Sequence, residues 1–257
     1  GHSNIASTFP LSTEIADKVA TFGADGFAEL VLDHALAMAE KGSVKKALRY
    51  LVARSYLADT PREVAAFLRL HGHTHPHVFT PVAIGDLLGE GDGAYADALR
   101  AHFCRAMTFQ NLSLLPALRH FLTEGGFRLP GEAQKVDRLL WTFAQCFWSA
   151  NRASAERGAF ASADAVFVLS FAVIMLNTDL HKAGRDDSRG GGARNKRHKP
   201  MKVDQFVSNL RGVNAGADFD RATLVDIYDS ILRRQIQMAH DRPTPAPPPP
   251  GSTTASA

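Results

Sequence analysis

The stretch FVLSFAVIMLNTDLH, residues 167–181, constrains the fold of this 257-residue chain more than any other. It is apolar on nearly every side and turns abruptly polar at its end. Strands usually run about four to eight residues, so a strand this long and continuous is disfavoured. The apolar run from Ala165 to Leu176 is also shorter than the roughly 18 residues of a membrane span. With Ser162 as a suitable cap and Asp164 in the first turn, the pattern predicts a central, buried helix.

The other patterned segments also predict helices. In DTPREVAAFLRLHG, Thr60 is a suitable N-cap, Pro61 fits the first helical position and Glu63 completes a capping box, and we expect the helix to stop at Gly72. The segment TPVAIGDLL repeats the Thr-Pro start. Apolar residues recur three and four positions apart in NLSLLPALRHFL and ATLVDIYDSILRRQI. We therefore expect an all-α protein with about ten helices joined by short loops.

Two segments have compositions that cannot bury a core. Residues 182–199 hold seven basic and two acidic residues around a triple glycine, so this loop carries more positive charge than the whole chain, whose net charge is +3. Residues 242–257 contain six of the 13 prolines. We expect cloning-tag residues and a lead-in over 1–25, one domain over 26–240 that contains the basic Gly-rich loop, and a Pro-rich disordered linker over 241–257.

The two cysteines, Cys104 and Cys146, have neither a paired nor a metal-type spacing. A chain of this length can bury a large core without disulfides. The sequence therefore predicts a reducing, cytoplasmic setting.

The stretch FRLPGEAQKVDR, residues 127–138, places Glu132 directly after a Pro-Gly turn at the start of an amphipathic helix. Glu132 precedes Val136 by four positions and Leu139 by seven, so it lies at the edge of the apolar stripe in the first helical turn. One interpretation is a carboxylate that only complements the helix dipole. The other is a carboxylate at the rim of an apolar surface, directed at a partner. These residues alone leave both interpretations open.

Taken together, the two stretches resemble the two motifs of the SEC-seven domain, the catalytic module of guanine-nucleotide exchange factors for ARF-type small GTPases. FRLPGEAQKVDR resembles the first motif, and FVLSFAVIMLNTDLH resembles the second nearly letter for letter. The similarity continues in AIGDLLGE, LPALRHFL, FAQCFWSAN, NLRGVNAGADF and YDSI, and covers roughly residues 42–238 in the expected order.

The resemblance implies a right-handed superhelix of about ten helices, with an apolar groove between the two motifs that takes the switch regions of the GTPase. Glu132 matches the glutamate that the family inserts into the nucleotide site. Positions matching the groove are Phe167, Phe171, Ile174 and Met175, and polar positions near its rim are Gln134, Asp137, Asn177 and Asp179. The domain needs no cofactor of its own, because it acts on GDP, GTP and Mg²⁺ bound to the partner. The resemblance also implies peripheral recruitment to Golgi, endosomal or plasma membranes.

Electrostatics explains how such a glutamate would act. A GTPase holds the nucleotide β-phosphate with a lysine, backbone amides and Mg²⁺. A carboxylate that enters this site competes for the lysine and repels the phosphate. A pair of unit charges 4 Å apart is worth about 4 kcal/mol at an effective dielectric constant near 20, and each 1.4 kcal/mol is about tenfold in a rate or equilibrium constant. Exchange of this kind forms and breaks no covalent bond.

Some positions depart from the family or bear on inhibition. The basic loop is about ten residues longer than in typical members of the family, and it could contact the GTPase or an anionic membrane, or be an inert insertion. Phe171, Ala172 and Pro200 match the pattern associated with insensitivity to brefeldin A, since sensitive members tend to have Tyr-Ser and methionine there. The resemblance therefore implies that this domain is insensitive.

Three other functions are weighed against nucleotide exchange. HGHTHPH offers imidazoles for Zn²⁺ or Cu²⁺, but no cysteine or carboxylate joins His71, His73, His75 and His77, so we expect no metal site. Nucleic-acid binding is disfavoured because the charge sits in one loop without aromatic residues. A helical module that binds an ARF protein without releasing its nucleotide remains the alternative, although the presence of Glu132 argues against it.

Overall fold

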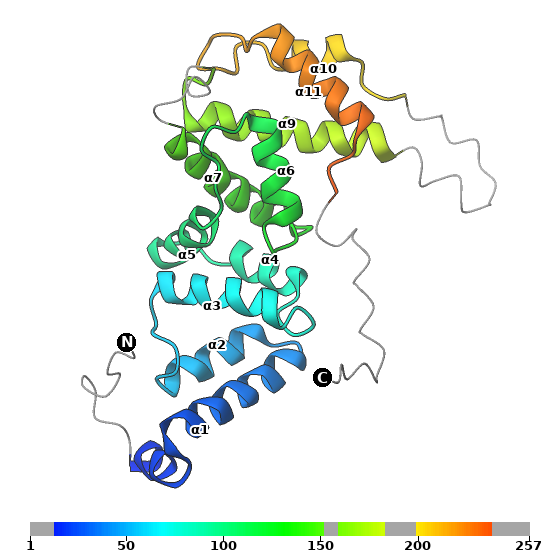
Figure 1. Ribbon diagram of the computed structural model, residues 1–257. Coiled ribbons are helices and arrows are strands. Elements are labelled where there is room, and N and C mark those ends of the chain that lie inside the picture. The colour runs from blue at the N-terminus through cyan, green and yellow to red at the C-terminus, as the bar shows by residue number, and fades with distance from the viewer. Residues whose placement is uncertain (1–12, 152–158, 183–198, 238–257) are drawn as a thin grey trace, which may run out of the picture.

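The computed structural model describes residues 13–151, 159–182 and 199–237 (Figure 1). These residues form helices and no strand, apart from an isolated bridge between Asn214 and Ala217. The ten helices are α1 (Thr13–Glu40), α2 (Val44–Ala53), α3 (Pro61–Thr74), α4 (Pro81–Gly89), α5 (Ala94–Arg105), α6 (Leu114–Glu124), α7 (Ala133–Ala150), α9 (Ala163–Lys182), α10 (Val203–Asn209) and α11 (Arg221–Arg233). The all-α prediction is confirmed. Helix α1 starts inside the predicted lead-in, whereas residues 183–198 of the basic loop and the linker predicted over 241–257 lie outside the described residues.

The helices are stacked along one direction, from α1 and α2 at one end to α10 and α11 at the other (Figure 1). Helix α3 packs against α5, α7 against α9, and α9 against α11. Buried aromatic rings join the layers, and Phe121 lies 4.8 Å from Phe127 and 4.9 Å from Phe143 between ring centroids. These rings join α6 to α7 and to the loop that leads into α7, and α7 in turn packs against α4 and α9.

The predicted helix starts are present, but Glu63 does not complete the predicted capping box, because the Thr60 backbone N–H donates to the Ala58 carbonyl at 2.8 Å. The Thr60 hydroxyl oxygen accepts a hydrogen bond from the Glu63 backbone N–H at 3.3 Å, and Thr80 caps α4 in the same way. The predicted stop at Gly72 is wrong, because α3 continues to Thr74. A Cβ on Gly72 would lie 2.8 Å from Cδ1 of Ile84. This glycine therefore allows α3 and α4 to approach each other closely and does not end the helix.

Helix α9 is the predicted central helix, and Ser162 caps it by accepting a hydrogen bond from the Ala165 N–H at 3.2 Å. By length and composition alone its residues Ala163–His181 could cross a membrane, with a mean hydropathy of 1.6. That differs from the expectation that no stretch of the chain is long enough. The helix packs against α6, α7 and α11, with residues such as Leu169, Val173 and Leu176 in the core. This packing is typical of the core helix of a folded domain.

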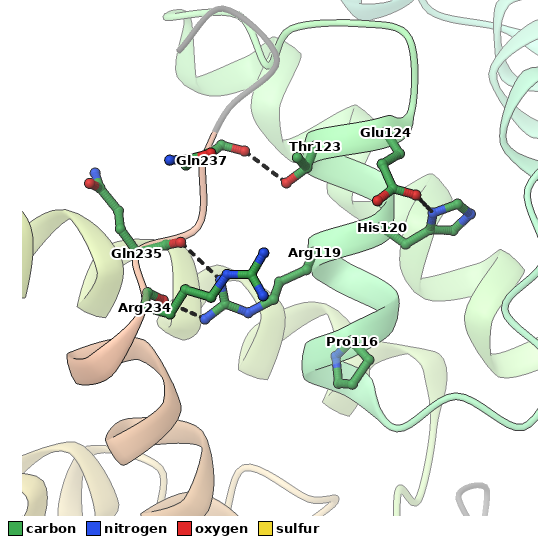
Figure 2. A pocket seen from close by; sticks show the side chains of 8 residues that line it. All are labelled: Pro116, Arg119, His120, Thr123, Glu124, Arg234, Gln235 and Gln237. Carbon is green, nitrogen blue, oxygen red and sulfur yellow. Dashed lines mark hydrogen bonds and ion pairs between the residues drawn. The ribbon is translucent and has the colours of Figure 1, made fainter. Parts of the chain in front are cut away.

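The segment after α11 is fastened to α6 and α9. Asn177 is buried, and its side-chain oxygen accepts a hydrogen bond from the Ile236 N–H at 2.7 Å. Figure 2 shows the α6 side of the contact, where Arg119 donates to the Gln235 carbonyl at 2.9 Å and Thr123 donates to the Gln237 carbonyl at 2.8 Å. A cavity of about 230 Å³ lies between α6 and this segment. Asn177 was predicted at the groove rim, but its amide lies in the interior.

We expect Asn177→Ala to act on stability. The substitution leaves the Ile236 N–H without its acceptor, and an unsatisfied buried group costs about 1–3 kcal/mol. The midpoint of urea unfolding should fall accordingly. KM for the substrate of any activity should stay unchanged at temperatures where the variant is folded. Thr178→Ala is the control, because Thr178 is exposed and bonds only within its own helix in the contacts described. Unchanged stability of Asn177→Ala together with weaker binding of the partner would instead support the predicted place of Asn177 at the groove rim.

The four histidines are divided between the end of α3 and the residues that follow it. His71 and His73 lie in α3, and the His71 and His75 Nδ1 atoms are 3.2 Å apart with stacked rings. Burial lowers the pKa of His71, and repulsion from His75 lowers it further, so the neutral ring is favoured. Among the described residues no three histidine, cysteine, aspartate or glutamate side chains are placed to hold a metal ion.

Candidate functional site

Glu132 lies at the start of α7, one residue before the first helical residue Ala133. The prediction that Glu132 lies in the first turn is off by one residue, because its backbone is extended, with φ −86° and ψ 126°. The side chain does not cap the helix; one carboxylate oxygen lies 2.9 Å from Nζ of Lys135, and 71% of the side chain is exposed. The carboxylate therefore projects into solvent from a rigid helix end.

Helix α4 holds the chain that leads into Glu132. The Arg128 backbone N–H donates to the Pro81 carbonyl at 2.7 Å. A Cβ on Gly85 would overlap the carbonyl oxygen of Arg128, and a Cβ on Gly89 would lie 2.7 Å from Cβ of Lys135. These two glycines, four residues apart, present one bare face of α4 to the loop and to the first turn of α7. This close contact with α4 fixes the position of the loop that ends at Glu132.

Lys135 connects Glu132 to the same helix. Its ammonium group lies 3.3 Å from the Asp86 carboxylate of α4, in addition to its contact with Glu132. The hydrogen bond to Glu132 and the neighbouring Asp86 raise the pKa of Lys135, so the lysine stays charged at neutral pH. The pairing orients the Glu132 carboxylate without burying it, and because 71% of the Glu132 side chain is exposed, the ion pair contributes little and the carboxylate can turn to another cation.

We expect Gly85→Ala to impair the site although Gly85 lies beneath it. The added methyl group must displace Arg128 and therefore the loop that carries Glu132. A misplacement of about 1 Å can cost a reaction up to about a hundredfold, so nucleotide release from the partner proposed below should slow at least tenfold. Gly131→Ala in the same loop is the control, because its Cβ would meet nothing within 4 Å. Equal rates for both variants would show that α4 does not set the position of Glu132.

An apolar strip lies on the other motif, and we define it as Phe167, Phe171 and Met175 of α9 together with Trp141 of α7. The three α9 residues are four positions apart and share one face. Phe171 is 38% exposed and Met175 is 54% exposed, whereas Phe167 is half-buried. The Phe167 ring lies 6.5 Å from the Phe171 ring and 5.9 Å from Trp141. The strip occupies the place where the resemblance implies a groove.

The remaining predicted positions differ in exposure. Gln134 and Asp137 are exposed and lie three residues apart on α7, as rim positions would. Ile174 is buried in the core and does not belong to the exposed face. Asp179 is half-buried, and its carboxylate accepts a hydrogen bond from the Met201 N–H at 2.7 Å, which ties the chain after the basic loop to α9.

Of the three positions linked to inhibitor sensitivity, Phe171 and Pro200 are exposed and Ala172 is half-buried.

Trp141 was absent from the predicted site residues. It follows Asp137 by four positions and Gln134 by seven, so helical spacing alone would have placed it on their face.

Sequence comparison identifies relatives of the chain. The family described as Sec7 domain, the SEC-seven domain of the sequence analysis, matches residues 31–236. Cytohesin-2 from Mus musculus is 40% identical over 197 residues, which are 77% of this chain and 43% of that protein. Brefeldin A-inhibited guanine nucleotide-exchange protein 4 from Arabidopsis thaliana is 36% identical over 200 residues, 78% of this chain and 10% of that protein. The chain therefore spans less than half the length of these relatives.

Solved structures with the same arrangement of helices include one described as ARF1-GDP bound to Sec7 domain complexed with Brefeldin A. It has a TM-score of 0.65 and 28% identity, and the match covers 84% of this chain and 96% of that one. The Sec7p catalytic domain has a TM-score of 0.60 and 32% identity, with 79% and 97% covered.

Proposed function

Because this chain belongs to the Sec7 domain family, we propose that it promotes GDP release from an ARF-type small GTPase, with Glu132 as the group that enters the nucleotide site. Two of the similar proteins support the partner and the reaction: one relative is a guanine nucleotide-exchange protein, and one similar structure holds ARF1-GDP bound to a Sec7 domain. The observation that carries the proposal is an exposed carboxylate, fixed at a helix start, on the helix that packs against the exposed apolar strip.

The two parts of the site have different tasks in this proposal. Burial of apolar surface stabilises a complex by about 25 cal/mol per Å², so the strip supplies binding energy when the switch regions cover it. That energy drives Glu132 off Lys135 and towards the lysine and Mg²⁺ around the nucleotide phosphates. Because Glu132 starts from a rigid helix end, little conformational freedom is lost on insertion. Nucleotide leaves without any covalent step, and the domain contributes no cofactor.

The proposal is tested by release of a fluorescent GDP analogue from a panel of purified ARF-class GTPases. We expect this domain to accelerate release from at least one of them at catalytic concentrations. A domain that forms a stable complex with an ARF protein yet leaves the release rate unchanged would contradict the proposal and favour a non-catalytic binding module. Action at Golgi, endosomal or plasma membranes stays a prediction.

We expect brefeldin A not to block this exchange. Phe171, Ala172 and Pro200 carry the residues associated with insensitivity, and Phe171 and Pro200 are accessible on the surface. Replacing all three, as Phe171→Tyr, Ala172→Ser and Pro200→Met, should produce a measurable inhibition by the drug in the same assay. Block of the unaltered domain at the doses that inhibit a sensitive exchange factor would refute the expectation.

A further inference from the structure

Trp141 is a large aromatic side chain that the core does not use. It is 40% exposed on α7, whereas the other tryptophan of the chain, Trp148, is half-buried. Its ring meets Phe167 edge to face, with an interplanar angle of 79°. Tryptophan is enriched among the few residues that dominate protein interfaces, because it buries much area and loses little conformational freedom. A half-covered tryptophan beside the aromatic residues of α9 is therefore a candidate contact for a partner protein.

The position of Trp141 joins it to the site on both helices. On α7 it shares a face with Gln134 and Asp137, both of which are exposed. Towards α9 it contacts Phe167, from which Phe171 and Met175 follow at four-residue steps. Trp141 therefore extends the polar face of α7 by one helical turn and also borders the apolar face of α9.

The direction of the helices shows where Trp141 lies relative to Glu132. Phe147 of α7 contacts Phe160 just before α9, while Trp141 contacts Phe167, so α7 and α9 run antiparallel (Figure 1). Moving along α7 from Trp141 back to Glu132 corresponds to moving along α9 from Phe167 towards Met175. Trp141 is at the far end of the strip from the carboxylate, well placed to bind and too remote to take part in nucleotide release.

We propose that Trp141 is a docking residue for the GTPase, and this inference rests on the proposed function. Its occupant is the apolar switch surface of an ARF-type GTPase flanked by basic side chains, because the strip is bordered by the exposed carboxylates of Asp137 and Glu132. Trp141 contributes to formation of the complex and leaves the release step to Glu132. In kinetic terms it lowers KM for the GTPase and does not change kcat.

The test compares Trp141→Ala, Trp141→Gln and Trp141→Phe with the unaltered domain. GDP release is measured over a range of GTPase concentrations, and binding to the nucleotide-free GTPase is measured by calorimetry. Truncation of a tryptophan that anchors an interface costs about tenfold or more in affinity. We expect KM to rise about tenfold for alanine and glutamine with kcat unchanged, and phenylalanine to retain most of the affinity. Leu30→Ala is the matched control, since Leu30 is 50% exposed on α1 at the opposite end of the molecule.

Several results would overturn the inference. One is unchanged KM and affinity for folded Trp141→Ala and Trp141→Gln while Phe171→Asp still weakens binding, which would leave the proposed function intact. A fall in kcat at unchanged KM would also overturn it, as would a dimer of the free domain that Trp141→Ala dissociates, because a second copy would then be the occupant. No acceleration by the unaltered domain would instead refute the proposed function itself.

Discussion

Glu132→Lys is expected to abolish most of the acceleration of GDP release while the domain still binds the GTPase. The substitution replaces a charge that attracts the phosphate-binding lysine and Mg²⁺ with one that repels both. One charge pair at about 4 Å contributes about 4 kcal/mol at an effective dielectric constant near 20, so even partial loss predicts a decrease of about 100- to 1000-fold. Release of a fluorescent GDP analogue gives the rate, and calorimetry with the nucleotide-free GTPase gives the affinity.

Two further variants make the result specific. Glu132→Gln keeps the shape and removes the charge, so it should slow release in the same direction without the new repulsion of Lys135. Glu124→Lys is the matched control: Glu124 is also an exposed glutamate with a basic partner on its own helix, His120 at 2.8 Å (Figure 2). It should leave the rate unchanged. Equal rates for Glu132→Lys and the unaltered domain would remove Glu132 from the mechanism.

Phe171→Asp is expected to weaken the complex with little effect on the folded domain. Phe171 is already 38% exposed, so aspartate costs little before binding. In the complex the new carboxylate would be covered by apolar surface, and burial of an uncompensated charge or polar group costs several kcal/mol. We expect KM to rise about 100-fold or more at similar kcat. Met175→Asp should act in the same direction, since Met175 is the most exposed residue of the strip.

The control for the strip is Leu30→Asp, which places the same charge on an exposed apolar residue of α1. Thermal unfolding of all three variants should agree to within a few degrees. If Phe171→Asp binds the GTPase as tightly as the unaltered domain does, the docking surface lies elsewhere, whatever the outcome for Glu132.

Features that depend on neighbouring residues in sequence were predictable. Thr60, Thr80 and Ser162 cap their helices because each hydroxyl bonds to a backbone group three residues later. The central helix was predicted from its composition, and the apolar spacing on α9 placed Phe167, Phe171 and Met175 on one face. The position of Glu132 was predicted to within one residue, because Pro130 and Gly131 mark the entry to α7 but do not fix its first hydrogen bond.

Features that depend on distant partners were not predictable. Gly72 looks like a helix stop until Ile84 is found against it. Asn177 looks like a surface residue beside Thr178 and Asp179 until Ile236, 59 positions later, occupies its amide. Trp141 lies off the core stripe of α7, and its spacing from Gln134 and Asp137 gives its face but not its neighbour, because the contact with Phe167 forms only when α7 and α9 pack together.

The bare face of α4 extends the site to residues that never meet the partner. A library of random substitutions selected for loss of exchange should contain substitutions at Gly85 and Gly89 as often as substitutions at surface positions. We expect these variants to fold and to bind the GTPase with normal affinity. Anyone mapping such hits by distance to the bound partner would misread them as folding defects. The loss of exchange in these variants would instead show that the position of the Glu132 carboxylate has changed.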